Sequence, residues 1–156
     1  MPRSLRSLAI DACADPDVID VQALRLPPGM PDDPTWWMAE IFSFGSAPGP
    51  VRALMALRQT LAPIVGASNT RSSREVFAVE SADDREVLAY EHDRHLDFWL
   101  GVAADDGLLQ LTTVVKLHGW RGRVYWAPVG ALHGPITRSM MRRTIQRTAA
   151  RQVLGS

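Results

Sequence analysis

The sequence predicts an α+β domain in which an antiparallel sheet packs against a long C-terminal helix. Three observations predict it: four consecutive segments with strand character are joined by tight turns, polar and apolar residues alternate within them, and the last third carries an apolar stripe of helical period. A length of 156 residues and 46% hydrophobic residues are typical of one folded domain. We therefore expect residues 1–156 to form a single domain, with residues 1–16 as a mobile N-terminal segment.

The first half of the chain predicts one strand followed by two short helices. Residues 18–26 are rich in β-branched and apolar side chains and end at a Pro-Pro-Gly break, which is typical of a strand. Residues 35–44 predict a helix with Asp32 or Asp33 as its N-cap, because a proline follows in the first turn. Residues 51–65 carry apolar side chains at helical spacing and predict the second helix.

The middle of the chain predicts an antiparallel meander of four strands. Short turns, including an Asp-Gly pair, separate segments that are rich in strand-forming residues. In the third segment, alternation places Leu96 and Phe98 on one face and His95, Asp97 and Trp99 on the other. The predicted strands are residues 75–81, 85–91, 94–104 and 108–117.

The C-terminal third predicts a long helix that covers the apolar face of the sheet. Residues 119–123 are interpreted as a loop leading into it, and apolar side chains then recur every three or four residues from Val124 onward. Pro128 and Pro135 predict a kink or a broken first half. The sheet should curve around this helix, because an antiparallel sheet with one apolar face needs a cover.

Charge is divided unevenly along a chain whose formal net charge is zero. No acidic residue follows Asp106, whereas eight Lys and Arg residues do. We interpret this as a basic half that meets an acidic half in the fold; an anion-binding half is the alternative, and the role of the arginines stays open. Zero net charge without an aromatic and basic platform argues against a nucleic-acid partner.

Several other classes of protein are disfavoured. Cys13 is the single cysteine, so neither an internal disulfide nor a thiolate metal centre is expected. The N-terminus lacks the apolar core of a secretory signal, and no stretch reaches the ~20 apolar residues of a membrane span. A cytoplasmic protein without a cofactor is the expectation.

The order of predicted elements resembles the helix-grip fold of the START and polyketide-cyclase-like superfamily (SRPBCC). Local motifs are found at residues 92–98, 111–115 and 122–126, then at His133, Ile136 and residues 140–143. Together they resemble a family of uncharacterised bacterial proteins of that superfamily, relatives of which look fused to epimerase-type proteins. The resemblance covers roughly residues 18–147 and implies a fold and a cavity, but not a reaction. Only about five strands are found, fewer than in the full superfamily fold.

Histidines and Asp97 are the candidate chemical groups. His92 and His95 are an odd number of residues apart, so they face opposite sides of a regular strand, and His92 is expected in the turn. His95 and Asp97 alone share a face, which is too few ligands for a zinc site, so no metal is predicted. They form either an acid–base pair or a polar outer-face pair bonded to neighbouring strands. His133 is either a structural residue or a polar group that reaches a ligand.

The leading prediction is a protein that binds a small hydrophobic or aromatic molecule between the sheet and the C-terminal helix. One alternative is a cyclase- or dehydratase-like enzyme that uses His95 and Asp97, or His133, as acid–base groups. A second is a protein–protein interaction module, in which a partner or a second copy covers Trp36, Trp37 or the basic helix. The predicted ligand-lining residues are Leu96, Phe98, Leu111, Thr113, Tyr125, Val129 and His133.

Overall fold

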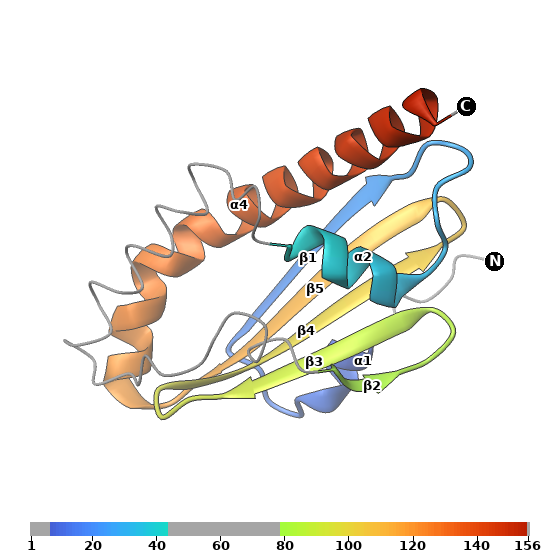
Figure 1. The fold of residues 1–156 in the computed structure, drawn as a ribbon. Helices are drawn as coiled ribbons and strands as arrows, with labels where there is room; N and C mark the ends of the chain where they lie inside the picture. Colours follow the sequence, from blue (N-terminus) through green and yellow to red (C-terminus); the bar gives the residue numbers. More distant parts are fainter. Residues whose placement is uncertain (1–6, 44–78, 156) are drawn as a thin grey trace.

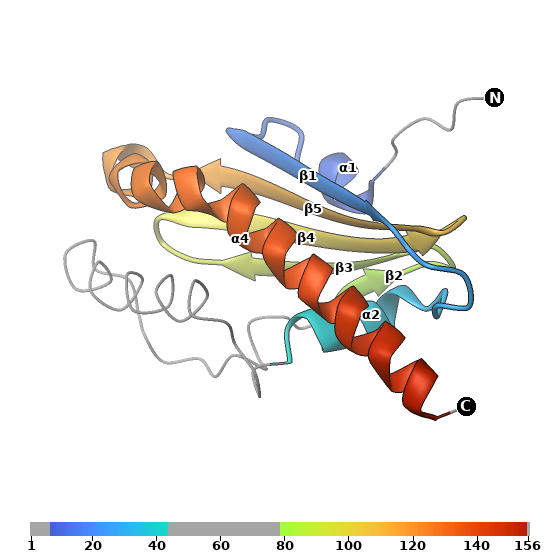
Figure 2. The same cartoon turned by 90° about the horizontal axis from the view of Figure 1, so that it is seen from above.

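The structure is a computed structural model that describes residues 7–43 and 79–155. It consists of a sheet with helices on both faces. The five strands in these residues form one antiparallel sheet in the order β1-β5-β4-β3-β2 (Figure 1). Figure 2 shows α2 and α4 on one side of the sheet and α1 on the other. The predicted α+β architecture with a long terminal helix is confirmed. The elements are α1 (Leu8–Ala12), β1 (Val18–Arg25), α2 (Pro34–Ile41), β2 (Val79–Ala82), β3 (Glu86–His92), β4 (Leu96–Asp105), β5 (Leu108–Leu117) and α4 (Gly119–Leu154).

The main core lies on the face that α2 and α4 cover, which we call the inner face. Alternate residues of the strands point to it, as the two-residue period of a strand requires. The buried core residues are Val87 and Ala89 of β3, Leu100, Val102 and Ala104 of β4, Leu109 and Leu111 of β5, Trp37, Met38 and Ile41 of α2, and Met141 and Ile145 of α4. A smaller cluster on the opposite, outer face joins Ala9 of α1 to Leu88 and Val114.

Helix α2 begins as the sequence predicts. The Asp33 carboxylate accepts hydrogen bonds from the backbone N–H groups of Thr35 at 2.9 Å and Trp36 at 3.2 Å, which caps the helix. Trp37 is fully buried and its indole donates to the Pro31 carbonyl at 2.8 Å, whereas Trp36 is half-buried and packs edge-on against it. The predicted helix over residues 51–65 and the strand positions 75–78 lie outside the described residues.

The structure differs from the sequence-based expectation at three element boundaries. Residues 8–12, expected to be mobile, form α1 on the outer face, where Ala9 is fully buried. Residues 119–123, expected to be a loop, are the first turns of α4, because Gly119 takes a left-handed backbone and starts the helix directly after β5. Strand β4 begins at Leu96, two residues later than predicted, and His92 is the last residue of β3 and not part of the turn.

Helix α4 runs without a break through both of its prolines. Pro128 and Pro135 lie inside it, and each lacks the N–H that would bond to the preceding turn. The helix axis changes direction in its first half (Figure 1), as a proline kink requires. No helix of the described residues is both long and apolar enough to cross a membrane.

A buried carboxylate attaches α1 to the sheet. Glu86 of β3 is 5% exposed and accepts hydrogen bonds from the Ser7 hydroxyl at 2.6 Å and the Leu8 backbone N–H at 2.7 Å. Gly101 lies against this carboxylate, and a Cβ at this position would collide with it. Glycine is therefore required here for space, so that Glu86 can reach the start of α1.

We expect Gly101→Ala to lower the free energy of unfolding by about 2 kcal/mol, because the added methyl displaces Glu86 from its partners. Urea denaturation measures it. In a Glu86→Ala background the collision is absent, so the same substitution should cost less than about 1 kcal/mol. An equal cost in both backgrounds would show that Gly101 is needed for another reason.

Asp17 connects the beginning of β1 to the end of β5. Its carboxylate accepts a hydrogen bond from the Leu117 backbone N–H at 2.7 Å and lies 3.5 Å from Lys116 Nζ. The bond from Leu117 is the main reason that the pKa of Asp17 lies below its ordinary value; burial opposes the shift and Lys116 adds to it. This contribution to stability is complete above the pKa of an unfolded aspartate and disappears as the pH falls through the lowered folded pKa.

We therefore expect Asp17→Asn to reduce the loss of unfolding free energy between pH 7 and about pH 3, since the asparagine does not titrate. Urea denaturation at several pH values measures this loss. Asp15→Asn is the matched control, because Asp15 is 91% exposed. The interpretation is wrong if Asp17→Asn and Asp15→Asn have the same pH profile.

Candidate functional site

The inner face carries a group of polar side chains where β1 meets α4. Asp20 and Gln22 are two residues apart on β1, so both point to the inner face. His133 reaches them from α4, with its Nδ1 3.1 Å from Asp20 Oδ2, and the Gln22 amide donates to Asp20 Oδ1 at 2.8 Å. Asp20 thus orients the imidazole ring of His133, and the side chains are only 23% and 19% exposed, respectively.

Thr113 lies beside this pair on β5, the strand between β1 and β4. It is the register partner of Asp20 on one side and of Leu100 on the other. Thr113 is 4% exposed, and its hydroxyl has no hydrogen-bond partner among the described residues. A buried unpaired hydroxyl costs roughly 1–3 kcal/mol, so its retention needs a reason such as a polar ligand.

Trp126 completes the group from α4. Its ring centroid lies 5.6 Å from that of His133, two helical turns further along the same face. The indole packs over Gly130, where a Cβ would lie only 2.6 Å from Trp126 Nε1. Because Gly130 has no side chain, Trp126 can lie along the helix towards His133. We call Asp20, Gln22, Thr113, Trp126 and His133 the inner polar group.

The predicted ligand-lining residues are buried to different depths. Leu111, Thr113 and Val129 are buried, and Phe98 is half-buried against the inner-face core. Leu96 and Tyr125 are half-buried. Asp20 brings two of these residues together, because it is the register partner of Thr113 and the hydrogen-bond partner of His133.

Asp20 and Gln22 were missed in the sequence, although β1 carried a signal. In the middle of β1 the alternation is inverted: the polar Asp20 and Gln22 face α4, whereas Ile19 and Val21 face outwards and are 47% and 39% exposed. Binary patterning alone would assign Ile19 and Val21 to the core. The sequence shows this alternation, but only the position of α4 shows which side is covered.

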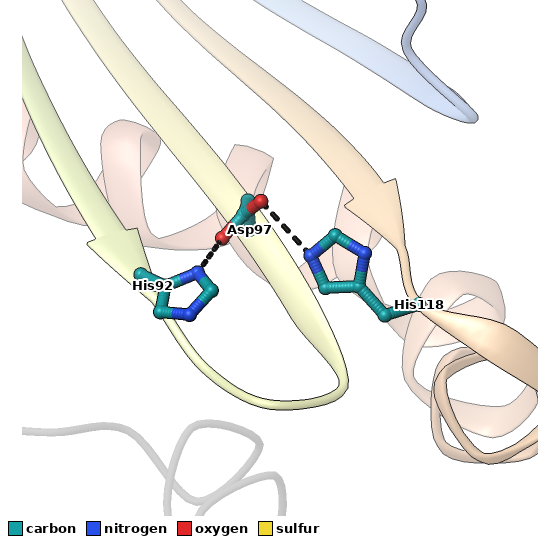
Figure 3. A group of neighbouring side chains, drawn as sticks. All are labelled: His92, Asp97 and His118. Atoms are coloured by element: carbon teal, nitrogen blue, oxygen red, sulfur yellow. Dashed lines mark hydrogen bonds and ion pairs between the residues drawn. The ribbon is translucent and has the colours of Figure 1, made fainter.

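A second cluster lies on the outer face, where β3, β4 and β5 end or begin (Figure 3). His92 and Asp97 are register partners on β3 and β4, and His118 follows the last residue of β5. Asp97 Oδ1 is hydrogen-bonded to His92 Nδ1, and Asp97 Oδ2 lies 2.9 Å from His118 Nε2. We call these three residues the His-Asp-His cluster; their ligand atoms all lie within 4.8 Å of one another.

Electrostatics favour a charged Asp97 in the His-Asp-His cluster. Burial by itself raises the pKa of Asp97, but the hydrogen bonds from His92 and His118 outweigh it and hold the pKa below its ordinary value. The Tyr90 hydroxyl donates to Asp97 Oδ1 at 3.3 Å. Burial and the negative charge of Asp97 raise the pKa of Tyr90, so this phenol stays protonated as a donor.

The predicted pairing of His95 with Asp97 is wrong. Because β4 begins at Leu96, His95 lies in the turn before the strand and does not follow its alternation. His95 is buried, and its Nε2 has no partner among the described residues. Asp97 instead bonds to His92 and His118, and neither Thr112 nor Lys116 is among the partners described for it.

The sequence did not reveal a third potential metal ligand. Among the neighbouring residues 92–97 only two side chains could share a face. His118 is 21 residues beyond Asp97 and becomes the third potential ligand because β5 runs antiparallel to β4. The register that pairs Asp97 with Lys116 brings His118 close to Asp97. This register is set by the fold and cannot be read from the sequence.

Comparison with known protein families identifies the family of this chain. A family model with the description "Protein of unknown function (DUF2867)" matches residues 12–140. The chain belongs to this family. The match to DUF2867 spans both the inner polar group and the His-Asp-His cluster, and it confirms the expected relation to an uncharacterised family. No curated protein and no solved structure matches.

In this DUF2867 protein the contact between Asp20 and His133 should be measurable as an energetic coupling. We expect Asp20→Ala and His133→Ala each to destabilise the fold, and the double variant to lose about 1 kcal/mol less than their sum. Urea denaturation of the four proteins gives the coupling. Strict additivity would mean that the two side chains do not interact in solution.

Proposed function

We propose that the protein binds a small molecule with an apolar or aromatic body and a polar end, held between the inner face of the sheet and α4. The inverted alternation of β1 is the observation that carries this proposal. In the middle of this strand the polar Asp20 and Gln22 occupy the covered side and the β-branched Ile19 and Val21 the open side, which is unfavourable for folding alone. Such a departure from the folding pattern is typical of functional positions.

The energetic balance supports a role beyond packing. Ile19 and Val21 remain about half exposed, so the chain forgoes part of the roughly 1.5–3 kcal/mol available from burying each of them. At the same time Asp20 is held under α4, and the Thr113 hydroxyl is buried without a partner in the described residues. A ligand that forms hydrogen bonds with Asp20 and with the Thr113 hydroxyl offsets the cost of burying these two polar groups.

The inner polar group and its apolar surroundings suggest how the ligand is held. His133, oriented by Asp20, and the Thr113 hydroxyl are the polar anchors, since each presents hydrogen-bonding capacity towards the inner face. Trp126, Phe98 and the predicted lining residues supply apolar and aromatic contact. Ligand sites commonly combine a few polar anchors with apolar walls.

The resemblance to the helix-grip superfamily agrees with this proposal. In that superfamily a cavity between a curved sheet and the C-terminal helix is expected, and the inner polar group lies between the corresponding elements of this chain. The resemblance supports the place of binding. The inner polar group adds that one end of the ligand should accept and donate hydrogen bonds.

An acid–base enzyme is the second candidate, and the Asp20–His133 pair favours it. A carboxylate that bonds to one imidazole nitrogen directs the other nitrogen for proton transfer, which is the arrangement of a general acid or base. The proposal therefore retains His133, and not His95, for cyclase or dehydratase chemistry. Turnover of a panel of polyketide-like substrates, lost in Asp20→Asn, would favour the enzyme over a binding protein.

The first test is native mass spectrometry of protein purified gently from cells, compared with its denatured mass. We expect a discrete small-molecule adduct that is absent after denaturation. The same spectrum gives the oligomeric state. A clean apo mass together with an oligomer would instead favour the interaction module.

We expect Thr113→Val to separate function from stability. The substitution removes a buried unpaired hydroxyl while keeping the shape of the side chain, so the free energy of unfolding should be unchanged or rise by up to about 1 kcal/mol. The adduct, or the fluorescence of a bound anilinonaphthalene sulfonate dye, should fall. Retained binding with higher stability would remove Thr113 from the site.

His133→Ala should weaken the same binding roughly tenfold, since a good anchoring hydrogen bond is worth about 1.4 kcal/mol. Leu132→Ala is the matched control, because Leu132 is the adjacent residue of α4 and 48% exposed. Dye titration measures both. Equal effects of the two substitutions would contradict a direct role of His133.

A further inference from the structure

We propose that the His-Asp-His cluster binds one divalent transition-metal ion, with Zn²⁺ as the reference ion and a coordination position open to solvent. The cluster lies on the outer face, across the sheet from the inner polar group, so this site goes beyond the proposed function. It uses His92 Nδ1, Asp97 Oδ1 or Oδ2, and His118 Nε2 as ligand atoms (Figure 3).

The backbone holds the three ligands close together independently of any ion. His92 and Asp97 face each other as register partners of β3 and β4. His118 is held by its backbone N–H, which donates to the His95 carbonyl at 2.8 Å and extends the β4–β5 ladder by one step. Gly122 packs against the same carbonyl, where a Cβ would collide, so the absence of a side chain lets the start of α4 lie close to this end of the sheet.

The ligand set selects the class of ion. Two imidazoles and one carboxylate are typical of zinc and of other first-row transition metals, whereas Mg²⁺ and Ca²⁺ prefer oxygen ligands alone. Three protein ligands leave a fourth position for water or substrate in a tetrahedral site. The His92 side chain is 64% exposed and that of His118 is 38% exposed, so this position faces solvent.

Small side-chain movements are enough to form the site. Ligand atoms in a tetrahedral zinc site lie ~3.3 Å apart, as metal–ligand distances of roughly 2.0–2.1 Å require. The present atoms lie within 4.8 Å of one another, and the exposed His92 ring can rotate to close the difference. Each ring nitrogen then presents a lone pair to the metal, because a neutral imidazole can carry its proton on the other nitrogen.

The surroundings of Asp97 provide the support that metal ligands usually have. Tyr90 donates to Asp97 Oδ1 at 3.3 Å, and its ring is stacked on Trp99 with centroids 5.0 Å apart. This hydrogen bond helps to fix the direction of the carboxylate. Hydrogen bonds of this kind orient ligands, and their loss commonly weakens metal binding by roughly 10–100-fold.

The competing explanation is a hydrogen-bonded bridge that only joins strand ends. In that case Asp97 accepts a hydrogen bond from the N–H of each imidazole, and the cluster stabilises the fold without an ion. Both explanations predict that Asp97→Asn is less stable. Only the metal site predicts stoichiometric binding that depends on all three residues, so binding and not stability must be measured.

The test is isothermal titration calorimetry of the full-length, untagged, chelator-treated protein with Zn²⁺. We expect one ion per chain, with an affinity that falls at least roughly tenfold in His92→Ala, His118→Ala and Asp97→Asn, and about tenfold in Tyr90→Phe. Co²⁺ in place of Zn²⁺ should give visible absorption bands of tetrahedral intensity. His92 is exposed, so His92→Ala keeps a folded variant available for this test.

Asp93→Asn is the matched control, because it makes the same chemical change in the turn that joins β3 to β4. It should bind Zn²⁺ as tightly as the unsubstituted protein. The proposal is overturned if the unsubstituted protein binds no stoichiometric ion, or if His92→Ala and Asp97→Asn bind Zn²⁺ as well as Asp93→Asn does. Thr113→Val should leave Zn²⁺ binding unchanged, so loss of the inner-face site and loss of the metal site are distinguishable.

Discussion

The antiparallel register between β4 and β5 decides which side chains the sheet presents on its inner and outer faces. It places Leu100 opposite Thr113 on the inner face and Asp97 opposite Lys116 on the outer face. A slip of β5 by one residue would turn Thr113 outwards and Lys116 towards α4, because successive side chains of a strand point to opposite faces. The buried residues Leu111 and Val102, which are also register partners, fix this register through the hydrophobic core.

The two faces of the sheet acquire different chemistry from this single alternation. On the inner face the core ends at the inner polar group, where β1 presents Asp20 and Gln22 to α4. On the outer face the sheet ends at the His-Asp-His cluster, with α1 packed further along the same face. The strands between them are shared, so the two proposed sites depend on one scaffold but can be altered separately.

Helix α4 links the acid-free end of the chain to its acidic half. Arg151 lies 3.2 Å from a carboxylate oxygen of Glu40 in α2, and Arg147 donates to the Glu40 carbonyl. Further back, Lys116 of β5 pairs with Asp15 at 2.8 Å. These contacts agree with the interpretation of the uneven charge as two halves that meet. They are largely exposed pairs, so each contributes little to stability compared with the apolar core.

Local patterns were enough to predict most of the fold. Strand β5 was predicted with its observed bounds, and the Asp33 cap of α2 follows from side-chain chemistry within a few residues. These predictions succeed because turns, caps and alternation are set by neighbours in the chain. His95 shows the limit of local patterns. The predicted strand started two residues too early, so its alternation paired His95 with Asp97. In the structure His95 lies in the turn before β4.

The sequence by itself determined the α+β class, the meander and the helix that covers it, because each depends on a short-range periodicity. Only the tertiary structure decided which polar residues meet. Asp20 and His133 are 113 residues apart, and His118 reaches Asp97 across 21 residues. Such pairs form when separate elements pack, and no local pattern specifies which of several polar residues will lie opposite one another.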